Sequence, residues 1–86
     1  MPKVKSVLKK LNTFVNESII ERYSTKGGRY RIEVEKNGDF YNILYYSNGR
    51  QDGASVHLTF DEYKKTLSDT IESASRISKI NYSKVA

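Results

Sequence analysis

Apolar and polar residues alternate with a period of two between positions 29 and 60, which predicts a series of short β-strands. Asn-Gly pairs at 37–38 and 48–49 break the alternation, and Asn-Gly is the preferred dipeptide of a two-residue hairpin. A corner at 37–38 places every second residue of both flanking strands on the same side of the sheet. That side is apolar and we expect it to be the core face; it holds Tyr30, Ile32, Val34, Tyr41, Ile43 and Tyr45.

The opposite face of this hairpin mixes cations, an amide, carboxylates and aromatics, unlike the plain polar surface of a solvated sheet. A corner at 48–49 continues the register into the next strand, with Ala54 and Val56 on the core face and Ser55 and His57 opposite. The pairs expected on the opposite face are Arg29 with Tyr46, Arg31 with Leu44, Glu33 with Asn42, and Glu35 with Phe40.

A further strand and a long helix flank this region. The run SIIERY suggests a strand that leads into a turn with paired glycines at 27–28. At the other side, Thr59 and Glu62 form a capping box. Apolar residues then recur at helical spacing, with no proline or glycine between them. This stripe comprises Phe60, Tyr63, Leu67, Ile71, Ala74 and Ile77.

We therefore predict the α+β class, with one domain over residues 1–86. Four antiparallel strands form a meander within 17–58, near 17–24, 29–36, 39–47 and 53–58, and one long helix at 59–80 backs it. Residues 1–16 have helical apolar spacing among lysines, which indicates either a short basic amphipathic helix or a flexible basic arm. Residues 81–86 are expected to fray.

The helix is expected to be longer than the sheet. About twenty residues at ~1.5 Å each span roughly 30 Å, whereas strands of about seven residues span ~23 Å. The stripe beyond the sheet then needs cover, and we expect a second copy of the chain to provide it. This homodimer interface comprises Ile71, Ala74, Ile77 and Ile80.

Composition and charge favour a polyanionic partner. The 86 residues carry a formal net charge of +5 and no cysteine, so neither a disulfide nor a thiolate metal site is available. Positive charge is concentrated toward the two ends, which suits nucleic acid or an anionic membrane surface, or simply aids solubility. With no apolar run of about 18 residues and no secretion signal, we expect an intracellular protein of the cytoplasm or nucleoid.

No residue pattern points to an enzyme. The single histidine, His57, has no nucleophile motif nearby, and the glycines form neither a Walker loop nor a dinucleotide fingerprint. Glu33 and Glu35 share a strand face but are expected only to border its surface. We predict no catalytic residue, no metal and no cofactor.

The face opposite the core is the expected binding site for single-stranded DNA or RNA. Unpaired bases stack on aromatic rings while Arg and Lys follow the phosphates, and Tyr46 beside Arg29 offers that combination. The predicted nucleic-acid-binding residues are Lys26, Arg29, Arg31, Phe40, Asn42, Tyr46, Arg50 and His57.

Five of these residues also have a structural interpretation. Tyr46 and Phe40 would cover a second apolar layer, such as the N-terminal helix. The arginines at 29 and 31 would pair with Glu17 or Glu21 of the first strand, and His57 would be a passive surface residue.

The passages RYRIEVEKNGDFYNILYY and VHLTFDEYKKTLSDTI, with the order of elements around them, resemble the positive cofactor four family of transcriptional coactivators and the related Pur-alpha and Whirly domains. The resemblance covers roughly residues 17–78. It implies single-stranded nucleic-acid binding on the sheet and a dimer formed partly through the helices. Glu33 and Glu35 depart from it, because family members often have basic residues there. The matching features are Arg29-Tyr30, Asn37-Gly38, the aromatic run Tyr41 to Tyr46, and Leu58-Thr59 with Asp61, Glu62 and Tyr63.

Two other functions fit the sequence. One is a protein–protein interaction module, such as a small inhibitor that docks through the aromatic face. The other is a membrane-surface protein that uses the basic N-terminal segment. Binding that collapses with salt would favour nucleic acid over a protein partner, because counterion release makes such binding steeply salt-dependent.

Overall fold

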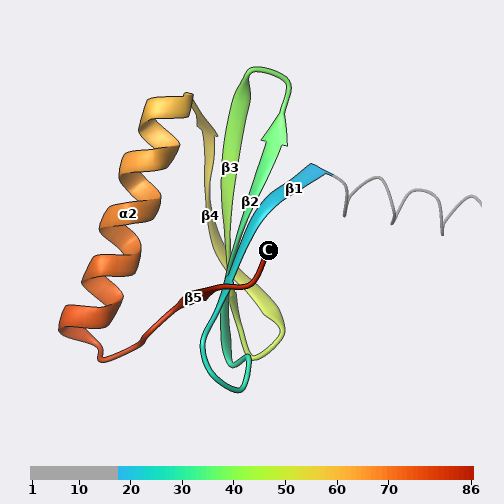
Figure 1. Ribbon diagram of the computed structural model, residues 1–86. Helices are drawn as coiled ribbons and strands as arrows, with labels where there is room; N and C mark the ends of the chain where they lie inside the picture. Colours follow the sequence, from blue (N-terminus) through green and yellow to red (C-terminus); the bar gives the residue numbers. More distant parts are fainter. Residues whose placement is uncertain (1–17) are drawn as a thin grey trace, which may run out of the picture.

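A computed structural model describes residues 18–86, within which four strands precede a single long helix and a fifth short strand follows it (Figure 1). All five strands belong to one antiparallel sheet. The strand order across the sheet is β4-β3-β2-β1-β5. The predicted α+β class is confirmed. The expected basic helix or arm at 1–16 lies outside the described residues. The elements are β1 (Ile19–Ser24), β2 (Tyr30–Asn37), β3 (Phe40–Ser47), β4 (Arg50–Leu58), α2 (Phe60–Ile77) and β5 (Ser83–Lys84).

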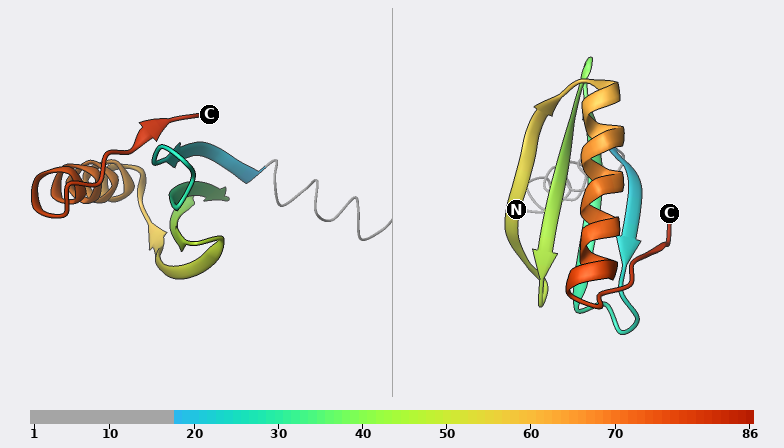
Figure 2. Two further views of the ribbon diagram at one scale, coloured as in Figure 1. Left: turned by 90° about the horizontal axis from the view of Figure 1, so that it is seen from below. Right: turned by 90° about the vertical axis from the view of Figure 1, so that its left-hand side faces the viewer.

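The buried core lies between the sheet and one side of α2 (Figure 2). Ile32, Val34 and Ile43 are fully buried, and Tyr63 and Leu67 of α2 close over them. The three strand residues belong to the face that the alternation predicts, so that face is confirmed as the core. The partly buried residues packed around them are Tyr23, Tyr41, Tyr45, Leu58, Ile71 and Tyr82.

The corner of the β2–β3 hairpin lies one residue later than predicted. Asn37 pairs with Phe40, so Gly38 and Asp39 form the turn. Of these two, only Gly38 has a positive φ, of 63°, which is the requirement of a type II′ turn rather than the expected type I′. Moving the corner by one residue moves every cross-strand partner by two. The predicted pairs are therefore wrong, while the membership of each face is unchanged.

The β3–β4 corner is at Asn48 and Gly49, as predicted. Both have positive φ, 53° and 79°, as a type I′ turn requires. Ser47 pairs with Arg50 directly after the turn, so β4 begins earlier than the expected residue 53.

Two bulges in β4 reverse part of its predicted orientation. Each adds an unpaired residue, the first soon after the turn and the second shortly before the helix. Ser55 turns to the core side, where its Oγ lies 3.1 Å from the Tyr45 hydroxyl oxygen. Val56 is 62% exposed instead. The predicted core positions of Ala54 and Val56 are wrong, and Leu58 returns to the core only after the second bulge.

The capping box at the start of α2 is confirmed. The Glu62 amide donates to Thr59 Oγ1 over 3.3 Å, and the Thr59 amide donates to Glu62 Oε1 over 2.9 Å. These hydrogen bonds lower the pKa of Glu62. The helix ends at Ile77, before the predicted residue 80. The Ser78 and Ile80 amides both donate to the carbonyl of Ala74 there.

The predicted overhang of the helix is wrong. α2 has 18 residues and β3 has 8, and both lengths correspond to about 27 Å. Of the predicted dimer residues, Ile71 packs on the core, while Ala74 and Ile80 are half-buried. Ile77 is the one with a strongly exposed side chain, at 73%.

The predicted fraying of residues 81–86 is also wrong. β5 pairs with β1 and adds a fifth strand to the sheet. The Arg22 amide donates to the Ala86 carbonyl over 3.0 Å, and the Val85 amide donates to the Arg22 carbonyl over 2.8 Å. Tyr82 packs on the core, and this burial raises the pKa of its hydroxyl.

Candidate nucleic-acid interface

α2 covers one face of the sheet, and no element within residues 18–86 covers the other (Figure 2). We call this second surface the open face. It includes residues that alternate with the core positions, residues near the second bulge of β4, and Val85 after β5. The members used below are Ile19, Arg22, Arg31, Glu33, Glu35, Phe40, Asn42, Leu44, Tyr46, Ala54, Val56, His57 and Val85.

The centre of the open face is a hollow of about 570 Å³, floored by β1, β2 and β3. Arg31 and Tyr46 pair across β2 and β3, and the Arg31 guanidinium carbon lies 4.6 Å from the centroid of the Tyr46 ring. Arg31 Nε is buried and has no hydrogen-bond partner within the described residues. A buried N–H group without an acceptor is costly, so the Arg31 side chain carries an unsatisfied donor at the floor of the hollow.

The two glutamates of the open face are both engaged. Glu33 Oε2 lies 3.4 Å from Arg22 Nε, and Glu35 Oε1 accepts a hydrogen bond of 2.9 Å from Asn42 Nδ2. These contacts reduce the negative field expected of the pair. Burial, together with the Glu33 carboxylate, raises the pKa of Tyr46, so its hydroxyl is neutral at physiological pH.

A second aromatic platform lies at the far end of the open face. The Phe40 and His57 rings stack with centroids 4.0 Å apart and an interplanar angle of 16°. The His57 amide donates to Asn42 Oδ1 over 2.9 Å, which holds the bulged residue in its positive φ of 62°. Both ends of the Asn42 amide are thus occupied within the protein, and its role here is structural.

The other predicted basic residues, Lys26, Arg29 and Arg50, lie elsewhere. Lys26 and Arg29 belong to the β1–β2 turn, and the Asn48 amide donates to the Arg29 carbonyl, joining that turn to the β3–β4 turn. The Arg29 guanidinium lies 5.4 Å from the Tyr30 ring, and Tyr30 belongs to the core face. The predicted pairing of Arg29 with Tyr46 is therefore wrong, and Arg31 occupies that place. Arg50 is exposed at the end of β4.

The structure therefore divides the eight predicted residues among three places. Arg31 and Tyr46 lie in the central hollow. Phe40, Asn42 and His57 lie at the far end of the open face. Lys26, Arg29 and Arg50 lie at the opposite end of the sheet.

Sequence reasoning missed three residues that line the hollow: Ile19, Arg22 and Val85. A register shift in β1 decides which of its side chains reach the open face. Val85 arrives only because β5 joins the sheet. The pairing considered for Arg31 with Glu21 does not occur, because Glu21 lies on the core side.

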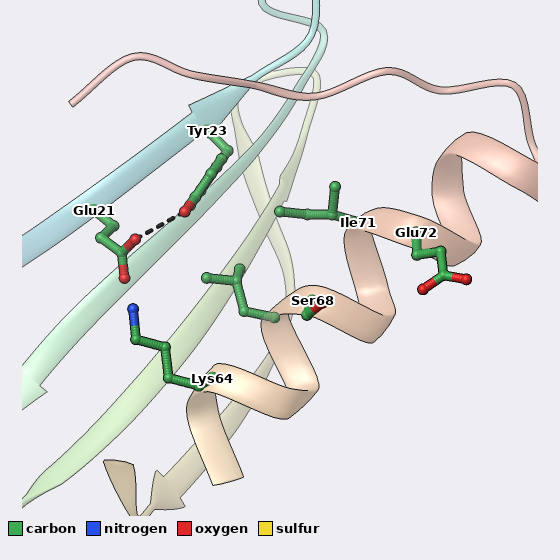
Figure 3. Close-up of a pocket in the computed structure, with 7 residues that line it drawn as sticks. Glu21, Tyr23, Lys64, Ser68, Ile71 and Glu72 are labelled. Carbon is green, nitrogen blue, oxygen red and sulfur yellow. Dashed lines mark hydrogen bonds between the residues drawn. The ribbon is translucent and has the colours of Figure 1, made fainter. Parts of the chain in front are cut away.

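Glu21 is instead the centre of a polar network under α2 (Figure 3). It is 8% exposed, and the hydroxyls of Tyr23 and Tyr63 each donate to its carboxylate over 2.8 Å. Lys84 Nζ lies 3.5 Å from the same carboxylate. Burial acts to raise the pKa of Glu21, but the two tyrosine hydrogen bonds and the Lys64 and Lys84 charges lower it overall. Burial and the Glu21 carboxylate raise the pKa of Tyr23 to about 12.

This network borders a hollow of about 430 Å³ between β1 and α2. Figure 3 shows the Glu21 and Tyr23 side chains directed at each other, with the Lys64 amine facing Glu21. The Glu21 carboxylate already has three partners in the protein, Tyr23, Tyr63 and Lys84. We therefore assign it a structural role, in which it links β1 to α2 and β5. Within the described part of the chain, no group of three His, Cys, Asp or Glu residues is placed to hold a metal ion.

Comparison of the chain with protein-family models, with curated proteins and with solved structures finds no match. Across residues 18–86, no helix is long and apolar enough to cross a membrane.

Proposed function

We propose that this protein binds single-stranded DNA or RNA along its open face and does not catalyse a reaction. The observation that carries the proposal is the Arg31–Tyr46 pair in the central hollow. The Tyr46 ring offers a stacking surface to a base, and the Arg31 guanidinium beside it offers N–H donors to a phosphate or a base carbonyl. Single strands need this combination, because they expose both base faces and phosphates.

The spacing of the aromatic platforms supports the same function. Tyr46 lies near one end of β3 and Phe40, stacked on His57, lies at the other. Phe40 and Tyr46 are six positions apart along β3, which corresponds to about 20 Å. A single strand that follows β3 would therefore meet both platforms, with Arg22 and Arg31 beside its path.

The resemblance to the positive cofactor four family supports a role in transcription or DNA maintenance and a homodimer. In the dimer that we propose, two α2 helices meet around Ile77, whose apolar side chain is 73% exposed. The interface is smaller than the sequence predicts, because Ile71 already packs on the core of its own chain.

A protein partner is the second candidate, and one observation favours it. The charged side chains of the central hollow balance, two arginines against two glutamates, and the remaining surface is apolar at Ile19, Leu44 and Val85. Val85 is 63% exposed. Such a surface also suits an apolar anchor of another protein.

Fluorescence anisotropy with labelled oligonucleotides tests the proposal. We expect saturable binding of single-stranded DNA or RNA, weaker binding of duplex DNA, and an affinity that falls steeply between two salt concentrations. Absence of binding to every single strand at low salt would refute nucleic-acid binding. Retrieval of a defined protein whose affinity is insensitive to salt would then favour the second candidate.

A further inference from the structure

A third hollow, separate from the open face, lies where the β1–β2 turn meets the chain that leaves α2. Its volume is about 300 Å³, at the lower end of the range for small-molecule sites. Two segments far apart in the sequence converge on it, and three of the residues they contribute are cationic. The lining residues are Thr25, Lys26, Arg29, Tyr30, Lys79, Ile80 and Asn81.

Within residues 18–86, the positive charge of this hollow has no compensating carboxylate. The described residues that line it include no Asp or Glu. Among residues 18–86, no carboxylate lies within ion-pair distance of Lys26, Arg29 or Lys79. Arg22 and Lys84, by contrast, each have a glutamate partner. Three like charges that share a concave surface repel one another and raise the local concentration of anions.

The backbone that presents Lys79 is strained. Lys79 has a φ of 58°, a left-handed conformation that follows the end of α2 and usually belongs to Gly or Asn. The Ile80 amide nevertheless donates to the Ala74 carbonyl over 3.0 Å, so the chain is fixed on both sides of the lysine. Glycine would fit this backbone conformation better than lysine, so a lysine here points to a role for its side chain.

The opposing turn is also shaped to present its cations. Gly27 and Gly28 both have positive φ, 88° and 76°, which lets the chain reverse between Lys26 and Arg29. The Thr25 amide donates to the Tyr30 carbonyl over 3.0 Å and closes the turn at its base. The Arg29 guanidinium rests over the Tyr30 ring, which restricts its side chain.

We propose that this hollow binds a phosphoryl group, held by the side chains of Lys26, Arg29 and Lys79, with the Asn81 amide beside it. Arg and Lys are the side chains best suited to phosphate oxygens. The phosphoryl group comes either from a free phosphate compound or from the terminus of a nucleic-acid strand. The site goes beyond the proposed function, because free phosphate would bind there even if the open face takes a different partner.

Titration of the full-length chain with inorganic phosphate, followed by amide NMR at constant ionic strength, tests the site. We expect saturable shifts at Lys26 to Arg29 and at Lys79 to Asn81. Lys79→Gln should weaken phosphate binding about fivefold, in the range of one exposed ion pair. Lys36→Gln, which removes the same charge from the end of β2, should leave it unchanged.

Lys79→Gly separates binding from folding. Glycine relieves the positive φ, so this variant should melt at the same or a higher temperature and still lose phosphate affinity. Lys79→Arg should retain binding. Shifts that do not saturate, or affinities that Lys79→Gln and Lys79→Gly leave unchanged, would overturn the proposal.

Oligonucleotides with a 5′-phosphate or a 5′-hydroxyl distinguish the two sources. A Lys79-dependent preference for the phosphorylated strand assigns the hollow to strand ends. Equal affinities, with saturable binding of inorganic phosphate, assign it to free phosphate compounds. Tyr46→Ala should weaken strand binding and leave phosphate binding unchanged, so failure of the open face and failure of this hollow give different results.

Discussion

The Arg31–Tyr46 pair gives the most direct test of the open face. Tyr46→Ala removes a half-buried ring on which a base would stack. Stacking on an aromatic side chain contributes about 1–3 kcal/mol, so Kd should rise about 5- to 150-fold. The dependence of log K on log salt should keep its slope, because no charge is lost. Tyr46→Phe should stay close to wild type, since it keeps the ring.

Arg31→Gln should act differently on the same assay. Loss of one phosphate contact weakens binding to all sequences and reduces the salt slope by about 0.7 for a single strand. The variant should remain folded, because Arg31 has no salt bridge within residues 18–86 and its Nε has no hydrogen-bond partner there. Arg76→Gln is the matched control, since Arg76 lies on α2 and pairs with Glu72 at 3.6 Å.

Anisotropy at four salt concentrations, with melting curves on the same samples, measures both effects. Phe60→Ala controls for the loss of an exposed aromatic ring, because Phe60 lies on α2 and not on the open face. An unchanged Kd for Tyr46→Ala, in a protein that melts normally, would refute stacking at this position. If Tyr46→Ala unfolds the protein and binding per folded molecule is unchanged, Tyr46 is a packing residue.

Two further predictions concern assembly and the first hairpin. Ile77→Glu should convert a dimer to a monomer with little change in stability, because the side chain is 73% exposed in the single chain; wild-type protein that scatters light as a monomer at micromolar concentration would contradict the dimer. Gly38→Ala should lower the free energy of unfolding by about 1–2 kcal/mol, because alanine is disfavoured at a φ of 63° although space is free around it. Gly38→Asn should cost less in the same denaturant titration, and equal costs would show that φ is not the cause.

The alternation of residues predicts the two faces correctly because it depends only on parity. The corner moved from Asn37-Gly38 to Gly38-Asp39, and every partner moved with it by two positions, so Ile32 and Ile43 stayed on the core face. The helix start was predictable for a similar reason, since the capping box at Thr59 is a local interaction.

The errors arise where distant contacts override the local pattern. Bulges in β4 reverse the orientation of Ser55 and Val56, and no dipeptide signals them. Pairing of β5 with β1 brings Val85 to the central hollow, although the sequence near the C-terminus has no strand pattern. Arg29 does not lie on the open face, because it belongs to the β1–β2 turn and its guanidinium lies over the ring of Tyr30 on the core face. The local sequence pattern therefore predicts the order of strands and helix better than it predicts where the candidate site residues lie, because tertiary contacts decide those positions.

The Glu21 carboxylate links the core to the open face, and its charge makes this link depend on pH. Glu21 accepts from Tyr63 of α2 and contacts Lys84 of β5, and the next residue, Val85, lines the central hollow. Because the folded-state pKa of Glu21 is lowered, the carboxylate stabilises the fold fully above the ordinary value of 4.5. That contribution is lost as the pH falls through the folded-state value.

Glu21→Gln should show the size of the contribution at neutral pH. Two hydrogen bonds of 2.8 Å lose their charge assistance, at about 1 kcal/mol each, and the Lys84 contact is lost. We expect a free energy of unfolding lower by about 2 kcal/mol and a Tm lower by about 8–16 °C. The Glu72→Gln control, at an exposed ion pair, should change stability by less than about 0.5 kcal/mol. The difference between wild type and Glu21→Gln should shrink at pH values below 4.5, where the wild-type carboxylate also loses its charge. A difference that stays constant from neutral pH through acid unfolding would mean that the carboxylate charge does not hold β1, α2 and β5 together.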